Sequence, residues 1–200
     1  MKGKENKNMA NYCRGILKVV TKNKDVIERI KRIFNYEDDE YCLHHVHDFQ
    51  DYGEMYEDGD YFVQNFIIAA PWLCEPFLNH GDFPDKKLCI KKVYKDGKWN
   101  REYGTAHFTD LSHLATVLGF GCEFWTEDGM MFAEHGLVKS DGHYEYDIAD
   151  YEISFPKKKD GDYDYDNPIE KSGFGEGWKD WMYAKEIYGE EGGVKTKQTE

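Results

Sequence analysis

The amino-acid sequence predicts an α+β fold in which helices cover one face of an antiparallel sheet. Two segments with helical spacing of apolar residues lie among segments whose apolar residues alternate or run together as in strands. Two Asp-Gly pairs separate strand-like segments, which is typical of antiparallel hairpins. The chain has 200 residues, which suits one domain with a large insertion, and 16% of them are aromatic. That aromatic content argues against a wholly disordered acidic chain.

The first predicted elements are a strand over residues 13–20 and a helix that follows it. The strand shows alternating polarity, and Asn23 is a suitable N-cap for the helix. The helix has an apolar stripe at Val26, Ile27, Ile30, Ile33 and Phe34, with charged residues on its other face.

An acidic block, residues 36–60, interrupts this pattern, with ten Asp and Glu and no Lys or Arg. We expect it to be an insertion in the domain. A buried strand is predicted over residues 61–70, and the proline-containing stretch 71–84 is expected to be a long ordered loop. Asp96-Gly97 then predicts a hairpin between residues 88–94 and 98–103.

A second short helix is predicted after Thr109, which we expect to be its N-cap, and before Gly119, which ends it. Its apolar stripe comprises Leu111, Leu114, Ala115 and Leu118. A strand over residues 121–126 follows, with a turn at Asp128-Gly129, and a further strand is expected over residues 144–155.

The chain therefore divides into a leader, one folded domain and a C-terminal extension. Without its insertions, the domain has the order βαββαβ, which is the ferredoxin-like split βαβ arrangement with an extra C-terminal hairpin and helix. The expected boundaries are a flexible leader 1–8, a domain 9–155, an acidic loop 156–175, a helix 176–189 and a disordered tail 190–200.

Three short motifs resemble a known family. Residues 9–19 (MANYCRGILKV) resemble the opening of the YubB-type ferredoxin-like domain family of phage, plasmid and integrated-element proteins. Residues 99–105 (WNREYGT) and the strand around Phe124-Trp125-Thr126 resemble two later elements of that family. Gly15 stands where the family commonly has Asn, and Tyr103 and Ala106 stand where Trp and Lys are expected. The resemblance implies a ferredoxin-like fold and a mobile-element origin, and it brings no catalytic residues with it.

The sequence also indicates a compartment. No apolar run approaches the ~20 residues that span a bilayer, and residues 1–8 lack the apolar region of a signal peptide. The five Cys are widely spaced and include no CxxC pair, which is typical of reduced thiols. We therefore expect a cytoplasmic protein of a bacterial host cell that contacts no membrane.

Two clusters are candidates for chemistry. Cys42, His44, His45 and His47 are metal-capable, but their spacing matches no recognised finger and a second half-site is missing. His107, Asp110 and His113 are candidates for acid/base catalysis, although Asp110 at the start of a helix also suits the helix dipole. No cofactor is expected. A small metal- or His-dependent hydrolase is one alternative function, and a non-enzymatic role is favoured over it.

A second alternative is a binder of single-stranded nucleic acid. Ferredoxin-like sheets can stack bases on exposed aromatic side chains, and here the candidates are Tyr12, Phe124 and Trp125, with Arg14 and Lys18 for phosphates. Aromatic residues also favour strands for packing reasons alone. A formal net charge of −13 disfavours direct nucleic-acid binding.

The favoured function is a non-enzymatic accessory protein of a phage or mobile element that binds a basic host or element protein. Carboxylates interleaved with tyrosines offer such a partner both charge and aromatic anchors. A nucleic-acid-processing enzyme is one such partner, and the protein would then act as a nucleic-acid mimic that inhibits a defence nuclease. The alternative is a solvated face that keeps the chain soluble. The expected binding residues are Glu37, Asp38, Asp39, Glu40, Asp48, Asp51, Glu54, Glu57, Asp58 and Asp60.

Overall fold

The computed structural model confirms the α+β class. It describes residues 12–43, 48–71, 89–95, 98–104, 106–128, 132–159, 161–175 and 179–190. The expected leader 1–8 and the loop residues 72–84 lie outside these ranges, as do the histidines of the Cys42–His47 cluster and all but the first residue of the expected tail.

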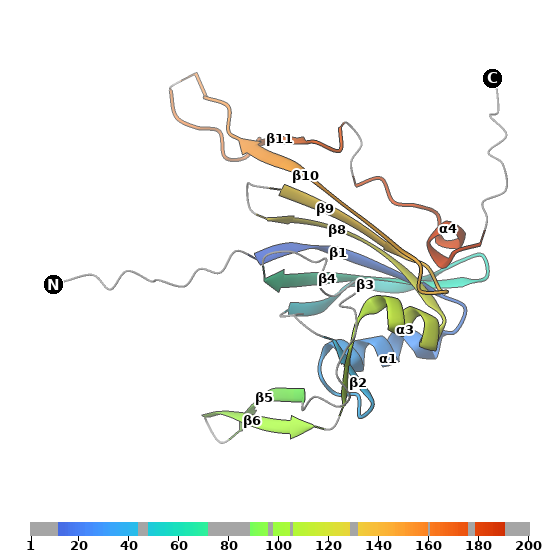
Figure 1. Ribbon diagram of the computed structural model, residues 1–200. Coiled ribbons are helices and arrows are strands. Elements are labelled where there is room, and N and C mark those ends of the chain that lie inside the picture. Colours follow the sequence, from blue (N-terminus) through green and yellow to red (C-terminus); the bar gives the residue numbers. More distant parts are fainter. Residues whose placement is uncertain are drawn as a thin grey trace, which may run out of the picture.

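The main sheet is antiparallel and contains seven strands in the order β11-β10-β9-β8-β1-β4-β3 (Figure 1). β1 is central, pairing with β4 on one side and β8 on the other. The bounds are β1 (Tyr12–Thr21), β3 (Asp48–Asp58), β4 (Tyr61–Pro71), β8 (Phe120–Asp128), β9 (Phe132–Val138), β10 (Tyr144–Ser154) and β11 (Ile169–Ser172).

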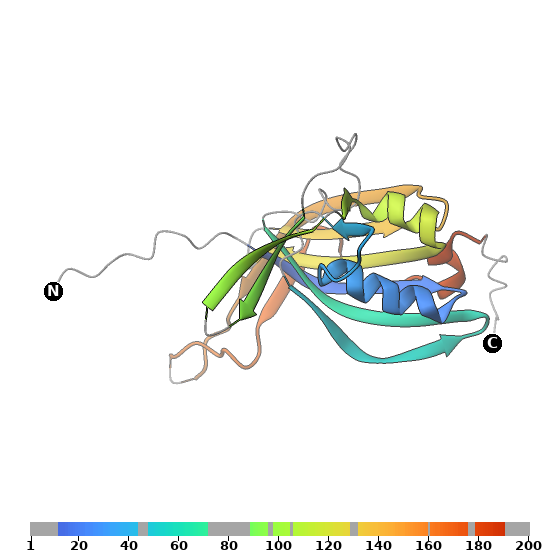
Figure 2. The same ribbon diagram turned by 90° about the horizontal axis from the view of Figure 1, so that it is seen from below.

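Two helices, α1 (Lys24–Phe34) and α3 (Leu111–Leu118), cover one face of this sheet (Figures 1 and 2). Their apolar residues pack against Leu17, Phe66 and Phe124, which are fully buried. All five predicted stripe residues of α1 are buried, as the helical spacing requires. We call this side of the sheet the helix face and the opposite side the open face.

The helix ends follow local capping chemistry. The Asn23 side chain accepts a hydrogen bond from the backbone N–H of Asp25 at 3.1 Å, which confirms it as the N-cap of α1. The expected cap at Thr109 is wrong by one residue, because Thr109 is the last residue of the short strand β7 (His107–Thr109). Asp110 caps α3 instead, and Gly119 ends it with a left-handed φ of 71°.

The acidic block contributes an edge strand to the sheet, where an insertion was expected. β3 lies wholly inside residues 36–60 and pairs with β4 on both sides of an irregularity between Tyr52 and Tyr56. Phe49 anchors it by stacking on Phe34 and Phe66 from the helix face. Earlier in the same block, β2 (Tyr41–Leu43) pairs in parallel with β7. The predicted hairpin forms as β5 (Cys89–Lys95) and β6 (Lys98–Gly104), but it is a separate two-stranded sheet.

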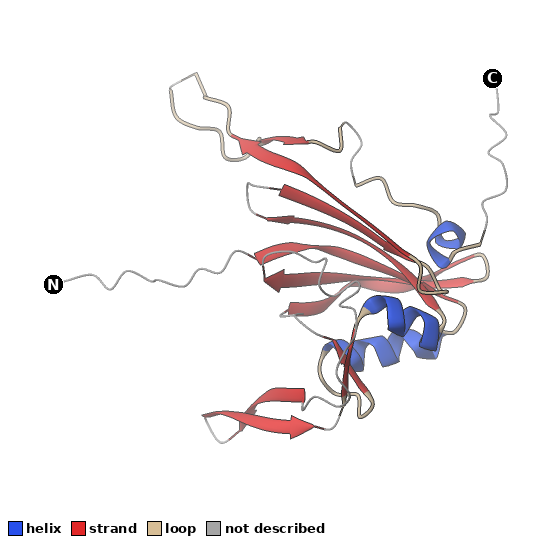
Figure 3. Ribbon diagram, viewed as in Figure 1, coloured by secondary structure: helices blue, strands red, loops and turns tan. Residues whose placement is uncertain are grey.

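The C-terminal segment, residues 179–190, lies on the open face (Figure 3, where its helix is the blue turn apart from α1 and α3). Its helix α4 (Ala184–Tyr188) is shorter than the helix expected over residues 176–189. Ile187 is fully buried against Val20 and Leu137 of the sheet. Gly121 permits this contact, since a Cβ at that position would lie 2.1 Å from the Ile187 carbonyl oxygen.

Candidate functional site

The acidic edge, defined as residues 48–60, comprises β3 and the turn into β4. β3 is the last strand of the sheet order, so within the described residues the outer side of its backbone pairs with no other strand. Five of the predicted binding residues lie on β3 and Asp60 lies in the turn. An edge strand rich in charge resists pairing with another chain while leaving its side chains accessible.

Three of the acids near α1 form ion pairs within the fold. Arg29 contacts Asp38 at 3.2 Å and Glu40 at 2.5 Å, while Lys31 contacts Asp51 at 3.1 Å. Asp38 is also a structural residue of its turn, because its Oδ1 accepts backbone N–H bonds from Glu40 and Tyr41. Partial burial opposes ionisation of Asp38, but these N–H donors and Arg29 outweigh it and lower its pKa.

The acids farther along β3 have no such partners. Glu54, Glu57, Asp58 and Asp60 are exposed and form no ion pair with any described residue. We call these four residues the unpaired acids. Tyr52 and Tyr56 lie beside them with 54% and 45% of their surface exposed. Charge without an internal partner and exposed rings occur together at this end of the strand.

The ten predicted residues do not form one continuous surface. Pairing with β4 places Tyr56 and Asp58 opposite Val63 and Tyr61, on the open face. Asp51 reaches Lys31 of α1 on the helix face. Glu37 and Asp39 lie in the turn after α1, where both are exposed. The predicted set therefore contains a paired group around α1 and the unpaired acids near the β3–β4 turn, while Glu37, Asp39 and Asp48 belong to neither group.

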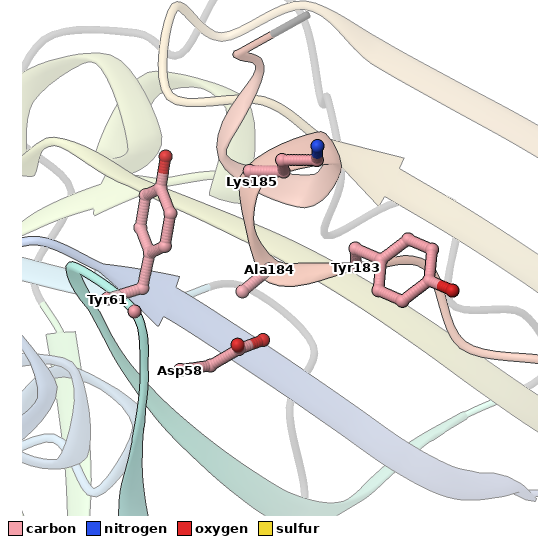
Figure 4. Close-up of a pocket in the computed structure, with 6 residues that line it drawn as sticks. Asp58, Tyr61, Tyr183, Ala184 and Lys185 are labelled. Atoms are coloured by element: carbon pink, nitrogen blue, oxygen red, sulfur yellow. The ribbon is translucent and has the colours of Figure 1, made fainter. Parts of the chain in front are cut away.

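A pocket lies directly beside the unpaired acids. It has a volume of about 290 Å³ and is lined by Asp58, Gly59, Tyr61, Tyr183, Ala184 and Lys185. We call it the tyrosine pocket. In Figure 4 the rings of Tyr61 and Tyr183 stand on either side of Asp58 and Ala184, and Lys185 extends away from Asp58. The β3–β4 turn supplies one wall and the C-terminal segment supplies the other.

One side of the tyrosine pocket is fixed by an internal cation. The Lys22 ammonium lies 5.4 Å from the ring centroid of Tyr61 and 5.3 Å from that of Tyr188, and it pairs with Glu190. The Tyr61 hydroxyl donates to Glu190 at 2.5 Å. Burial, followed by this bond to Glu190, raises the pKa of Tyr61 to about 12, so its ring is neutral at physiological pH.

Sequence reasoning missed a buried polar network under the C-terminal segment. Glu123 is fully buried on the open face, where its Oε1 lies 2.9 Å from His135 Nε2 and its Oε2 accepts the Met182 N–H at 3.0 Å. Lys18 donates to the Met182 carbonyl at 3.1 Å, and burial lowers the pKa of Lys18 despite Glu123 nearby. The network fastens residue 182 to the sheet. A Glu between Cys122 and Phe124 in an apolar strand was its only sequence signal.

A second buried acidic group lies on the helix face of the sheet. Glu134 is fully buried and accepts hydrogen bonds from Thr126 at 2.7 Å and from Tyr146 at 2.6 Å. Asp128 lies nearby with only 7% of its surface exposed. Burial and then the charge of Glu134 raise the pKa of Asp128.

Of the two other candidate clusters, the structure describes His107, Asp110 and His113 but only Cys42 of the metal-capable group. Asp110 accepts the His113 backbone N–H at 2.7 Å as the cap of α3, while the His107 and His113 side chains are exposed. Cys42 is buried, and no group of metal-capable side chains occurs in the described part of the chain. Cys13 and Cys122 are also buried.

Two of the three expected base-stacking aromatics are buried. Phe124 is fully buried in the core on the helix face. Trp125 points to the open face but stacks on His135 with 4.1 Å between centroids, and Phe174 meets its edge. The side chain of Tyr12 lies outside the described part. Neither Phe124 nor Trp125 offers a free ring face of the kind that stacks on a base.

Comparisons of the chain with protein-family models, with curated proteins and with solved structures found no match. Within the described residues, no helix combines the length and the apolar character needed to cross a bilayer.

Proposed function

We propose that this chain is a non-enzymatic accessory protein that binds a basic protein through the acidic edge. The observation that carries the proposal is the division among the acids of residues 36–60. Asp38, Glu40 and Asp51 are paired with Arg29 or Lys31, whereas the unpaired acids are exposed beside Tyr52 and Tyr56. Carboxylates that form no ion pair inside the described chain are available to a cationic partner, and exposed tyrosines are typical anchors of protein interfaces.

A ferredoxin-like core is the finer assignment of the fold that we propose. The order β8-β1-β4-β3 supports this assignment, because it matches the order of the fourth, first, third and second strands of a βαββαβ unit whose helices would be α1 and α3. In this assignment β3 and β4 are the second and third strands of the unit in chain order, whereas the sequence predicted the β5–β6 hairpin in place of β3. The strands β9, β10 and β11 extend the sheet. The resemblance of residues 9–19 to the YubB-type family supports the same assignment.

A phage or mobile-element origin, and a host nucleic-acid-processing enzyme as the partner, belong to the same proposal. Such enzymes present Lys and Arg to phosphates, so a row of carboxylates is complementary to the surface that they already carry. An inhibitor of a defence nuclease that mimics nucleic acid is the corresponding role, in the cytoplasm of the host cell. The burial of Phe124 and Trp125 makes direct binding of single strands a weaker alternative.

Affinity capture with matched charge-reversal variants tests the proposal. The edge variant carries Glu54→Lys, Glu57→Lys and Asp60→Lys, and the control carries Asp147→Lys, Asp150→Lys and Glu152→Lys on exposed positions of β10. Both variants change the net charge equally. We expect basic proteins captured from host extract by the wild type to be lost with the edge variant and retained with the control.

The dependence on salt provides a second measurement on the same captured proteins. Because exposed charges are screened over about 8 Å at physiological ionic strength, recovery by the wild type is expected to fall as salt rises. Equal recovery by the edge variant and the control, at any salt concentration, would contradict binding through the acidic edge. Recovery of no basic protein by the wild type would contradict the proposed class of partner.

A further inference from the structure

We infer that the tyrosine pocket receives an arginine side chain of the basic partner. This inference rests on the proposed function, because it names the residue that the acidic edge would bind. The pocket adjoins the unpaired acids directly: Asp58 belongs to both, and Gly59 in the wall precedes Asp60. A partner drawn to the edge by charge would therefore meet this hollow first among the described surfaces of the β3–β4 turn.

The chemistry of the pocket walls suits a cation with an apolar stem. Asp58 supplies a carboxylate that has no ion-pair partner in the described chain, and the two tyrosine rings supply π faces. Ala184 and the ring carbons form an apolar surface along which methylene groups can pack. Tyr61 is a neutral phenol at physiological pH, so the cation would meet one carboxylate and not two anions.

The fold already holds a cation in similar surroundings. Lys22 lies over the rings of Tyr61 and Tyr188 while it pairs with Glu190, which is an arrangement of two tyrosines and one carboxylate. The tyrosine pocket repeats that combination with Tyr61, Tyr183 and Asp58, but without a cation paired to its carboxylate. The comparison supports a positively charged occupant over a neutral one.

Arginine fits this pocket better than lysine. A guanidinium is planar, so it can stack on a tyrosine ring while it donates two parallel hydrogen bonds to one carboxylate. It is also less strongly hydrated than an ammonium, which lowers the cost of leaving water for a pocket with apolar walls. Lys185 on the wall repels any cation, so the charged end of the occupant is expected at Asp58, away from Lys185.

Fluorescence anisotropy with three labelled peptides tests the inference on the full chain. The peptides carry the same flanking lysines and differ only at a central residue, which is arginine, lysine or the neutral isostere citrulline. We expect the arginine peptide to bind the wild type about tenfold more tightly than the lysine peptide, a difference consistent with a bidentate charged contact. Asp58→Asn and Tyr183→Ala should each remove most of this preference, while Tyr144→Ala, at another exposed tyrosine, retains it.

The outcomes separate this inference from the proposed function. Equal binding of the arginine and lysine peptides by the wild type, or a preference for arginine that survives both pocket variants, would overturn the inference. If either of these results is found and the edge variant with Glu54→Lys, Glu57→Lys and Asp60→Lys no longer binds the peptides that the wild type binds, the proposed function stands without the pocket. Binding of all three peptides equally by the wild type and the edge variant would overturn both. Asp58 and Tyr183 are exposed, so both pocket variants are expected to fold.

Discussion

At the scale of single residues, buried acids in this chain differ according to what surrounds them. Glu123 and Glu134 are fully buried, and each has a hydrogen-bond partner at both carboxylate oxygens. Asp128 is buried beside Glu134. Burial and then the charge of Glu134 disfavour the ionised form of Asp128, so we expect this carboxylate to destabilise the fold. The three acids are similar in sequence and unlike in energetic role.

Asp128→Asn should therefore stabilise the protein at neutral pH. The pKa of this carboxyl is higher in the folded state than in the unfolded state. Its protonated form therefore stabilises the fold at pH values below the unfolded-state pKa, and this stabilisation is lost as the pH rises through the folded-state pKa. Asparagine cannot ionise, so the variant avoids that loss. We expect a higher free energy of unfolding than the wild type at pH 7, measured in urea, and a gain that disappears near pH 3, an acidity below the usual pKa of Asp.

The exposed Asp147→Asn provides the control for this comparison, because it should change the unfolding free energy equally little at both pH values. A destabilised Asp128→Asn variant at pH 7 would show that the carboxylate has a favourable role in the fold.

At the scale of elements, the sequence predicts those elements whose apolar pattern is complete. The apolar stripe of α1 and the apolar run of β4 each contain enough buried residues for the type of element to be predicted from the sequence. β3 does not, because an edge strand is anchored from one side only, and Phe49 and Met55 are its inward-facing apolar contacts. Its eleven residues therefore appear as an acidic insertion when they are read without their partner strand.

The candidate site, like the elements, could be predicted from the sequence only in part. Its acids are visible as a charge run, but their division into paired and unpaired groups depends on Arg29 and Lys31, whose reach is set by how α1 packs. Tyr183 and Tyr61 are 122 positions apart, and only the docking of the C-terminal segment brings them to one pocket. The helix predicted over residues 176–189 is also longer than α4. Before α4 begins, the backbone of Met182 forms hydrogen bonds with the side chains of Lys18 and Glu123.

Gly121→Ala should loosen the C-terminal segment. A Cβ at this position meets the Ile187 carbonyl oxygen at 2.1 Å, so α4 must move away from the sheet. Hydrogen exchange is expected to rise across residues 184–190, with overpacking that destabilises the fold by about 1–3 kcal/mol.

Gly136→Ala is the matched control for this variant, because its Cβ would lie 2.2 Å from the Phe124 ring in the core on the helix face. It should also lower stability, but exchange in residues 184–190 should rise no more than in the rest of the chain. Equal exchange profiles in the two variants would show that Gly121 has no special role in docking α4.

At the scale of the whole molecule, the two ends of the sheet are protected in different ways. β11 closes one end with four residues, whereas β3 closes the other with eleven. A long edge strand invites pairing with a second chain unless charge or strand irregularity prevents it. The acids of β3, together with the irregular register between Tyr52 and Tyr56, are suited to that protective role, and binding of a basic partner would use the same charges.

Neutralising the edge should promote self-association. We expect Glu54→Gln, Glu57→Gln and Asp60→Asn in one chain to increase the dimer fraction in sedimentation velocity at concentrations where the wild type is unchanged. Asp147→Asn, Asp150→Asn and Glu152→Gln remove the same charge from β10 and should leave sedimentation unaltered. Association of both variants alike would assign the effect to net charge and not to the edge.

The buried thiols give the chain natural reporters of its own opening. Cys13 and Cys122 lie on neighbouring central strands, and Cys42 lies in the small β2–β7 pair beside Ala106. Burial and then Glu123 raise the pKa of Cys122, so its reactive thiolate is scarce while the sheet is closed. Alkylation at Cys122 would thus measure how often the middle of the sheet opens, and alkylation at Cys42 would measure the opening of the β2–β7 pair.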